Sequence, residues 1–421
     1  MRSGRGSSGG SCDSCDSCGF PMRIALITET FNPEGGGAER SAVQTATELA
    51  ARGHAVTMIA GYQPVRAPIA GPGPEAGVAV VGMSVYRLRF APDIWRFWHW
   101  AREQAAAGDF DVSLSVTMAA PATVVQPRGG TVRETHARNV AMRPTAIQRA
   151  VKRLALALTP KQRALLMLER KTLADPRLRR LVAVSRYVAD QLERHYRIDP
   201  AKIEVIPNAA SLPAADDAQR AAWRRRVRRG FNIPDDALVY LFAAYNPKLK
   251  GAGTLLRAAD RLARRGLDFV IVMAGEVQYA QQHLAAQLGI RERIRVVGPT
   301  QQMAQLYAAA DVTVLPTWYD PASKVVIESL MMGVPAISTR FNGASDLITG
   351  LNGDGAGQDS GRRGRVIADP GDADALAQAM AELADPAERD RCRAASAGLA
   401  DQLDMARHVD RLEQVLRAAA S

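Results

Sequence analysis

Short runs of apolar residues alternate along this chain with longer stretches whose apolar positions recur at helical spacing. In the first half, apolar runs at 23–28 and 55–60 enclose a glycine-rich loop and a helical stretch from about Ala38 to Arg52. Continuous apolar runs are typical of strands buried on both faces, and strands that alternate with helices form parallel sheets. The pattern therefore predicts βαβ units.

The same alternation returns after Pro234. Apolar runs at 238–243, 269–274, 294–297 and 312–315 are separated by helical stretches. Two sets of such units predict an α/β protein with two Rossmann-like, doubly wound parallel-sheet domains and a ligand crevice between them. We expect a disordered tail over 1–21, an N-terminal domain over 22–207, a linker over 208–235, a C-terminal domain over 236–395 and a helix over 396–421 that packs back on the first domain.

The composition of the chain bears on where in the cell the protein is located. The 421 residues are 47% hydrophobic and 23% charged, as in ordinary globular proteins. Because there is no apolar run of about 18 residues and no apolar stretch of a signal peptide in 1–21, we expect a cytoplasmic protein. Cys12, Cys15 and Cys18 have a spacing that metal sites also use, but their Gly- and Ser-rich surroundings favour a disordered tail.

Positive charge is concentrated in one block. The net charge is +11, and 128–186 contains 15 Lys or Arg but only three acids, Glu134, Glu169 and Asp175. A solvated basic face is one interpretation; an acidic glycan or lipid partner is the other. The stretch 150–158 combines an apolar stripe with basic residues, which is typical of helices at a membrane surface. Nucleic acid is disfavoured because the block lacks interleaved aromatic residues.

Two acids near the C-terminus are the main candidates for chemistry. A strand pattern at 311–316 is followed by a loop that contains Asp320 and then by a helical pattern from Lys324 to Met332 that contains Glu328. Ligands of parallel sheets collect at the carboxyl ends of strands, where a helix N-terminus attracts phosphate. Asp320 followed by proline is also a good helix N-cap that needs no ligand. The acid pair alone leaves both interpretations open.

Other residues are expected on the same rim of the second sheet. Lys248 and Lys250 follow its first predicted strand, and Gly275 and Glu276 follow its second. Fixed cations can stabilise the charge of a diphosphate leaving group. The Asp109-Phe-Asp111 triplet matches a metal motif superficially, but a turn at a strand entry explains it, and we expect no metal and no cofactor.

These residues resemble the retaining glycosyltransferases of family 4, which have the GT-B fold of two Rossmann-like domains. The resemblance spans nearly the whole chain from Met22, and the chain is most similar to the lipopolysaccharide core glucosyltransferases within the family. The motifs that carry it are Gly35-Gly-Gly-Ala-Glu-Arg40, Val182-Ala-Val-Ser-Arg-Tyr187, Ile203-Glu-Val-Ile-Pro-Asn208, Lys250-Gly251, the segment from Asp320 to Glu328, and Gln126-Pro-Arg-Gly-Gly-Thr-Val-Arg133.

The resemblance implies a role for each matching residue. Asp320 would contact the hexose hydroxyls and Glu328 the ribose, while Lys248 and Lys250 would bind the diphosphate. Other donor contacts would come from Gly36, Gly37, Gly275, Glu276, Ser323, Lys324 and Val325. The first domain would bind the acceptor through Arg128, Arg133 and His136.

Four positions depart from the family pattern. Asp320 replaces a glutamate, Tyr245 replaces an arginine that many members carry, Lys324 replaces a small apolar residue, and Ser41 replaces an aspartate of the core glucosyltransferases. The shorter Asp320 would tune which sugar is accepted, and Lys248 would have to supply the charge that Tyr245 lacks. Lys324 could contact phosphate directly, and Ser41 bears on acceptor identity.

The resemblance implies a metal-independent retaining transferase. It would move a hexose, glucose from UDP-glucose, to a glycan or glycolipid such as a lipopolysaccharide core, while peripheral on the cytoplasmic face of the inner membrane. Two alternatives remain open: a sugar-nucleotide epimerase on the same fold, and a basic binding module with an inactive transferase fold.

Overall fold

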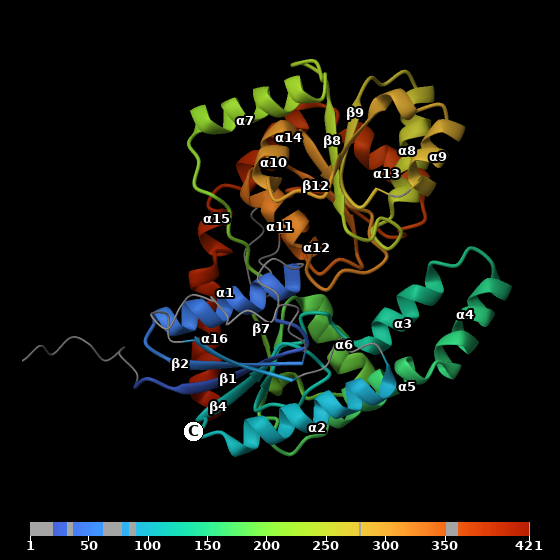
Figure 1. Ribbon diagram of the computed structural model, residues 1–421. Coiled ribbons are helices and arrows are strands. Elements are labelled where there is room, and N and C mark those ends of the chain that lie inside the picture. Colours follow the sequence, from blue (N-terminus) through green and yellow to red (C-terminus); the bar gives the residue numbers. More distant parts are fainter. Residues whose placement is uncertain are drawn as a thin grey trace, which may run out of the picture.

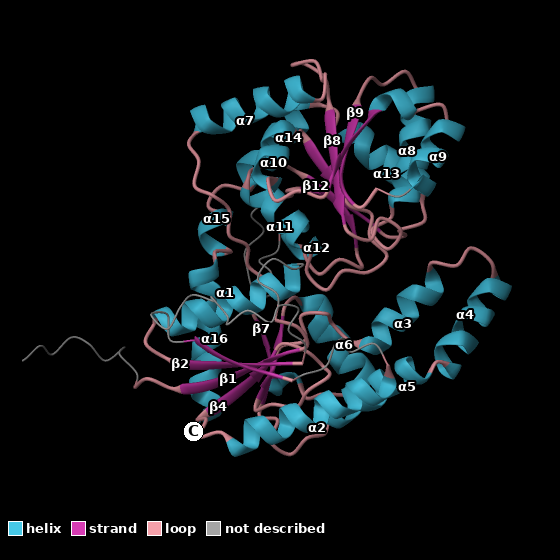
Figure 2. Cartoon of the chain, viewed as in Figure 1, coloured by secondary structure: helices cyan, strands magenta, loops and turns pink. Residues whose placement is uncertain are grey.

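The computed structural model describes residues 20–31, 37–61, 78–83, 90–277, 279–350 and 361–420. Within these ranges the chain forms two parallel sheets with helices packed around each, stacked as two domains in Figures 1 and 2. The predicted fold class is confirmed. The cysteines at 12, 15 and 18, together with most of the expected N-terminal tail, lie outside the described residues.

The first domain is built on a seven-stranded sheet in the order β3-β2-β1-β4-β5-β6-β7. Its strands are β1 (Arg23–Thr28), β2 (Ala55–Ala60), β3 (Val78–Gly82), β4 (Val112–Ser115), β5 (Val124–Val125), β6 (Arg180–Ala183) and β7 (Ile203–Val205). Its helices are α1 (Gly37–Ala51), α2 (Ala91–Ala107), α3 (Val132–Ala141), α4 (Ala146–Leu158), α5 (Pro160–Leu173) and α6 (Arg186–Tyr196). β1 and β4 are almost wholly buried because helices cover both faces of the sheet.

The second domain is built on a six-stranded sheet in the order β10-β9-β8-β11-β12-β13. Its strands are β8 (Val239–Ala244), β9 (Val270–Gly275), β10 (Ile294–Gly298), β11 (Val312–Val314), β12 (Ala336–Thr339) and β13 (Gly364–Ile367). Its helices are α8 (Ala252–Arg264), α9 (Tyr279–Gln287), α10 (Met303–Ala309), α11 (Lys324–Met331), α12 (Ser345–Thr349), α13 (Ala373–Glu382) and α14 (Pro386–Ala395). The strand order reverses beside β8 and β11, which is where ligands bind in such sheets.

The chain returns to the first domain at its C-terminus. After α15 (Leu399–Gln402), helix α16 (Met405–Ala420) packs on α1 and β4. Val409, Leu412 and Leu416 are fully buried in the core of the first domain. The last helix therefore belongs physically to the first domain and ties the two domains together.

The segment 208–235 differs from a plain linker because it contains helix α7 (Asp217–Gly230), which packs on α10 of the second domain. Arg228 explains this position. Its side chain is fully buried, Nη2 pairs with Asp311 at 2.9 Å, and Nη1 donates to three backbone carbonyls between 234 and 237. A buried arginine with every donor occupied anchors the helix without an apolar stripe.

Helices α3, α4 and α5 project from the first domain as a bundle beside the second domain (Figure 1). α4 has no buried residue, and Ile147, Val151, Leu154 and Leu158 are each at least 60% exposed. These four residues, spaced as one helical stripe, are called the α4 apolar stripe. None of the helices in the described ranges combines the length and hydropathy that a membrane span requires.

Candidate functional site

The structure brings Asp320 and Lys250 together, as the strand order predicts. Lys250 follows β8, Asp320 follows β11, and Lys250 Nζ lies 2.5 Å from Asp320 Oδ2. The backbone of Asp320 is also fixed, because its N–H donates to the Phe341 carbonyl at 2.9 Å and its carbonyl accepts from Gly343 at 2.9 Å. The carboxylate is therefore held in one place by two neighbouring loops and neutralised by one lysine.

Gly251 explains why Lys250 reaches this position and Lys248 does not. Gly251 has φ +81°, and a Cβ there would lie 2.1 Å from the Pro316 carbonyl, so only glycine lets the loop pass this close to the end of β11. Lys248 precedes this close approach and is exposed. Its side chain makes no hydrogen bond or ion pair with any residue in the described ranges.

Glu328 has a different environment from Asp320. It lies in the second turn of α11, and its Oε2 accepts a hydrogen bond from the Tyr307 hydroxyl at 2.8 Å. Burial raises the pKa of Glu328, while the bond from Tyr307 and the charges of Lys324 and Arg40 lower it. The pattern of the sequence gave no signal for Tyr307, which is an aromatic residue in an alanine-rich helix.

Lys324 opens α11 within a group of cations from both domains. Burial, together with the charges of Arg128 and Arg40, lowers the pKa of Lys324 to about 8, against the opposing effect of the Glu328 charge. Arg40 comes from α1 and Arg128 from the loop after β5, so the first domain contributes two positive charges to the surroundings of Lys324. Such an unneutralised group favours an anion.

Arg128 is positioned by a chain of buried polar groups. Its Nε donates to Gln126 Oε1 at 2.9 Å and its Nη2 to Thr45 Oγ1 at 2.8 Å, while its Nη1 is buried without a hydrogen-bond partner among the described residues. Burial lowers the pKa of Arg128 to about 10. His408 of α16 completes the chain: Nδ1 donates to the Pro207 carbonyl at 2.9 Å, which leaves Nε2 to accept from the Gln126 amide at 3.4 Å. The C-terminal helix thus helps to hold Arg128.

The other donor-side candidates are distributed around this rim. The amide of Ser323 donates to Asn342 Oδ1 at 3.2 Å, whereas Lys324 and Val325 are the first residues of α11, where amides have no carbonyl partner within the helix. Gly275 ends β9 with φ +92°, and Glu276 beside it is exposed. Gly37 is the first residue of α1, and Gly36 lies outside the described residues.

The loop that carries Asp320 also forms the contact between the domains. Tyr319 Oη donates to the Gly129 carbonyl at 3.1 Å, and a Cβ at Gly130, which has φ +68°, would lie 1.9 Å from this oxygen. Two residues after Tyr319, the Pro321 carbonyl accepts a hydrogen bond from Ser185 Oγ at 2.6 Å. The position of Asp320 therefore depends on how the two domains meet.

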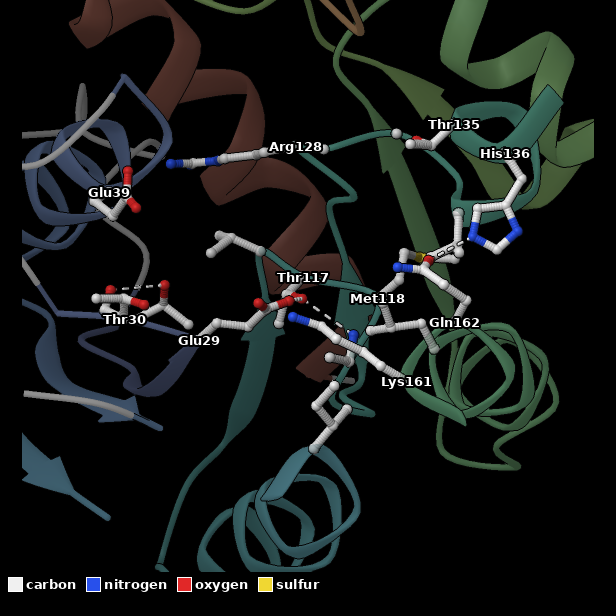
Figure 3. Close-up of a pocket in the computed structure, with 18 residues that line it drawn as sticks. Glu29, Thr30, Glu39, Thr117, Met118, Arg128, Thr135, His136, Lys161 and Gln162 are labelled. Atoms are coloured by element: carbon white, nitrogen blue, oxygen red, sulfur yellow. Dashed lines mark hydrogen bonds between the residues drawn. The ribbon is translucent and has the colours of Figure 1, made fainter. Parts of the chain in front are cut away.

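A cavity of about 510 Å³ lies in the first domain at the carboxyl ends of β1, β4 and β5 (Figure 3). Of the three residues proposed to bind the acceptor, Arg128 and His136 line this cavity and Arg133 does not. Glu29 and Glu39 also line it and are labelled in Figure 3, a contribution that the sequence did not single out. The cavity is therefore mixed in charge.

Residues 35–212 match the family described as Glycosyltransferase Family 4, and residues 236–386 match Glycosyl transferases group 1. A D-inositol 3-phosphate glycosyltransferase 2 of Catenulispora acidiphila is 32% identical over 208 residues, which cover 46% of this chain and 45% of that protein. The match thus spans less than half the length of this relative.

Two solved structures share the fold. WaaG, a glycosyltransferase involved in lipopolysaccharide biosynthesis, has a TM-score of 0.72 at 18% identity and covers 93% of this chain and 99% of its own. Anabaena HepE, solved in complex with UDP-glucose, has a TM-score of 0.65 at 16% identity and covers 94% and 100%. With both domains matched in sequence and in architecture, the chain belongs to the family 4, group 1 glycosyltransferases of GT-B fold.

Proposed function

We propose that the protein is a retaining, metal-independent glycosyltransferase that moves a hexose from a nucleoside diphosphate sugar, UDP-glucose, to a glycan or glycolipid. The observation that carries this proposal is the ion pair of Lys250 with Asp320 beside the free amides at the start of α11. The pair offers an acceptor for sugar hydroxyls, and the helix start offers donors for phosphate. The similarity to HepE, a UDP-glucose complex, supports the choice of donor.

The proposed reaction breaks the bond between the anomeric carbon and the diphosphate oxygen. Lys250, Lys324 and the amides of α11 stabilise the negative charge that develops on the diphosphate, and Arg128 and Arg40 add charge from the first domain. The acceptor hydroxyl attacks the anomeric carbon from the same face, and its proton passes to the departing diphosphate oxygen. Fixed cations supply the stabilisation that a metal supplies elsewhere, and no protein nucleophile takes part.

The acceptor would occupy the cavity of the first domain. Its carboxylates, Glu29 and Glu39, suit sugar hydroxyls, and His136 and Arg128 suit an acidic group on the same molecule. A glycan or glycolipid that carries an acidic substituent, such as a lipopolysaccharide core, would match both kinds of group. Its hydroxyls would bind the carboxylates, and its acidic substituent would bind His136 and Arg128.

The α4 apolar stripe would hold the enzyme against an anionic membrane. Its apolar residues are flanked by Arg149, Lys152 and Arg153 on the same helix, so apolar burial and attraction to acidic lipids act together. Replacing Ile147, Val151 and Leu154 with serine should abolish sedimentation with phosphatidylglycerol vesicles while leaving the melting temperature unchanged. Vesicle binding that survives this change would remove α4 from the proposal.

The reaction is tested by mass spectrometry of products. The protein is incubated with a panel of nucleotide sugars and a phosphorylated glycan extract, and we expect one hexose to be added to the acceptor only when the matching donor is present. Asp320→Ala should abolish the product. A converted sugar nucleotide without any transfer would instead support an epimerase, and ligand binding without turnover would support an inactive binding module.

A further inference from the structure

A second cavity, of about 750 Å³, lies between the projecting helix bundle of the first domain and the loops that follow β11, β12 and β13. Five arginines line it, and we call it the arginine cavity; they are Arg138, Arg143, Arg149, Arg257 and Arg340. It shares none of its lining residues with the cavity of Figure 3. Neither the sequence pattern nor the proposed reaction assigns it a role.

Most of the positive charge of the arginine cavity is not paired with a carboxylate of the described residues. Asp369 is the one acid among its lining residues, and its Oδ1 already accepts from the Gly371 amide at 2.8 Å. Arg138 pairs with Glu134 at 3.1 Å, and Arg149 Nη1 donates to backbone carbonyls. Arg143, Arg257 and Arg340 form no ion pair with any carboxylate in the part of the chain that the structure describes. Concentrated charge of one sign in a concave site attracts a ligand of the opposite sign.

Aromatic rings hold part of this charge in place. The guanidinium of Arg138 lies 4.1 Å from the centroid of the Phe341 ring, and that of Arg340 lies 4.9 Å from it. One ring therefore attracts two cations that repel each other, which fixes their donors before a ligand arrives. Trp318 adds a second aromatic wall, and Gly371 leaves room for it, since a Cβ there would lie 3.3 Å from the indole.

The arginine cavity adjoins the candidate active site through one loop. Trp318 lies two residues before Asp320, and its amide donates at 2.9 Å to the carbonyl of Leu249, the neighbour of Lys250. The opposite wall comes from the end of α3 and the start of α4 in the first domain. A ligand in this cavity would touch both domains and the loop that positions Asp320.

We propose that the arginine cavity is a binding subsite for an anionic saccharide, a sugar that carries phosphate or carboxylate groups. Guanidinium groups bind phosphate and carboxylate oxygens with two parallel hydrogen bonds, and aromatic rings pack against the apolar face of a sugar. The inference rests on the proposed function only in choosing a saccharide as the carrier of the charge. A phospholipid headgroup has the same phosphate chemistry, so the experiment separates the two sources.

Isothermal titration with glucose 1,6-bisphosphate tests the subsite without requiring turnover. We expect the full-length protein to bind it, to bind unphosphorylated glucose at least tenfold more weakly, and to lose about tenfold or more in affinity in the double variant Arg257→Ala, Arg340→Ala. The matched control is Arg225→Ala, Arg229→Ala, which removes two exposed arginines of α7 and should change affinity less than twofold. Asp320→Asn should keep the binding, which separates this subsite from the donor rim.

Three results would overturn the proposal. Unchanged affinity in the Arg257, Arg340 double variant, or equal affinity for glucose and its bisphosphate, would show that the cavity does not bind the anionic sugar. Loss of sedimentation with phosphatidylglycerol vesicles in that variant, with sugar phosphate binding intact, would assign the cavity to a lipid headgroup.

Quenching of Trp318 fluorescence by the bisphosphate, absent in Trp318→Phe, gives a second readout. If no hexose transfer is found but this binding persists, the proposed function fails and the subsite stands.

Discussion

Asp320 and Glu328 come from one short segment, yet the structure gives them opposite environments. Asp320 lies in a loop, and a lysine from another strand end neutralises it at 2.5 Å. Glu328 lies in α11, and a neutral phenol is its hydrogen-bond partner at 2.8 Å, with cations nearby but not in contact. Both acids are half-buried, but one is paired with a charge and the other is bonded to a neutral hydroxyl.

We propose from this difference that the two acids have different roles in binding the donor. A ligand that reaches Asp320 must share it with Lys250, so its binding also changes the position of the lysine charge. A ligand that reaches Glu328 finds a carboxylate held by one fixed donor and exchanges no ion pair. The first environment suits the reacting end of a donor, and the second suits a hydroxyl distant from the reaction. The spacing of the two acids along the sequence cannot by itself show this distinction.

The largest expected effect is the loss of Lys250. Lys250→Met leaves Asp320 without its cation and removes charge from the diphosphate, so kcat for hexose transfer should fall by about a hundredfold or more. Lys248→Met is the matched control, because Lys248 is exposed and its side chain forms no hydrogen bond or ion pair with the described residues. It should lower kcat by less than about threefold. Steady-state kinetics of both variants decide the point. Equal losses would mean that the contact with Asp320 is not what matters.

A smaller effect is expected from moving the loop of Asp320 without touching its charge. Gly130→Ala adds a Cβ against Tyr319 Oη at a residue with φ +68°, which should destabilise the protein by about 1–2 kcal/mol and lower turnover. Binding of the nucleotide alone, which would depend on Glu328, should be unchanged. Thermal melting and UDP titration measure the two effects. Adding Tyr319→Phe should restore part of the stability, and a failure to do so would place the strain elsewhere.

The smallest expected effect is a pH dependence of donor binding that arises from Lys324, whose charge interacts with Glu328. Burial lowers the pKa of Lys324 to about 8. The charged form that would attract phosphate is therefore lost as pH rises through 8, and donor KM should increase several-fold between pH 7 and 9. Because the folded pKa is below that of the unfolded chain, stability should rise over the range from about 8 to 10.5. In Lys324→Arg the KM should be flat over this range, and an unchanged rise would exclude Lys324 as its cause.

Sequence patterns predicted the parts of this molecule that follow from local periodicity. The buried strands, the two parallel sheets and the meeting of the loops after β8 and β11 all follow from apolar runs and from the rule that parallel strands end at one edge. The position of Lys250 beside Asp320 was therefore predictable. That Lys248 takes no part in this ion pair was not predictable, because it depends on the close approach at Gly251.

The features that sequence could not show depend on single long-range contacts. α7 is rich in arginine and has no apolar stripe, so the segment 208–235 looked like a linker. The bonds of Arg228 and Arg224 to Asp311 hold it in place, together with the buried side chain of Val227. Tyr307 meets Glu328 across 21 positions, and Arg128 is oriented through Gln126 by His408, far along the chain. No local pattern encodes such pairs.

The division of work between the two acids is tested most directly by calorimetric titration of UDP and UDP-glucose into Asp320→Asn and Glu328→Gln. Asp320→Asn should bind UDP as the unchanged protein does but lose the part of the affinity that the hexose adds. Glu328→Gln should lose about tenfold in affinity for both ligands, because it weakens the half-buried acceptor that we propose for the ribose. Equal losses for both ligands in both variants would contradict the account.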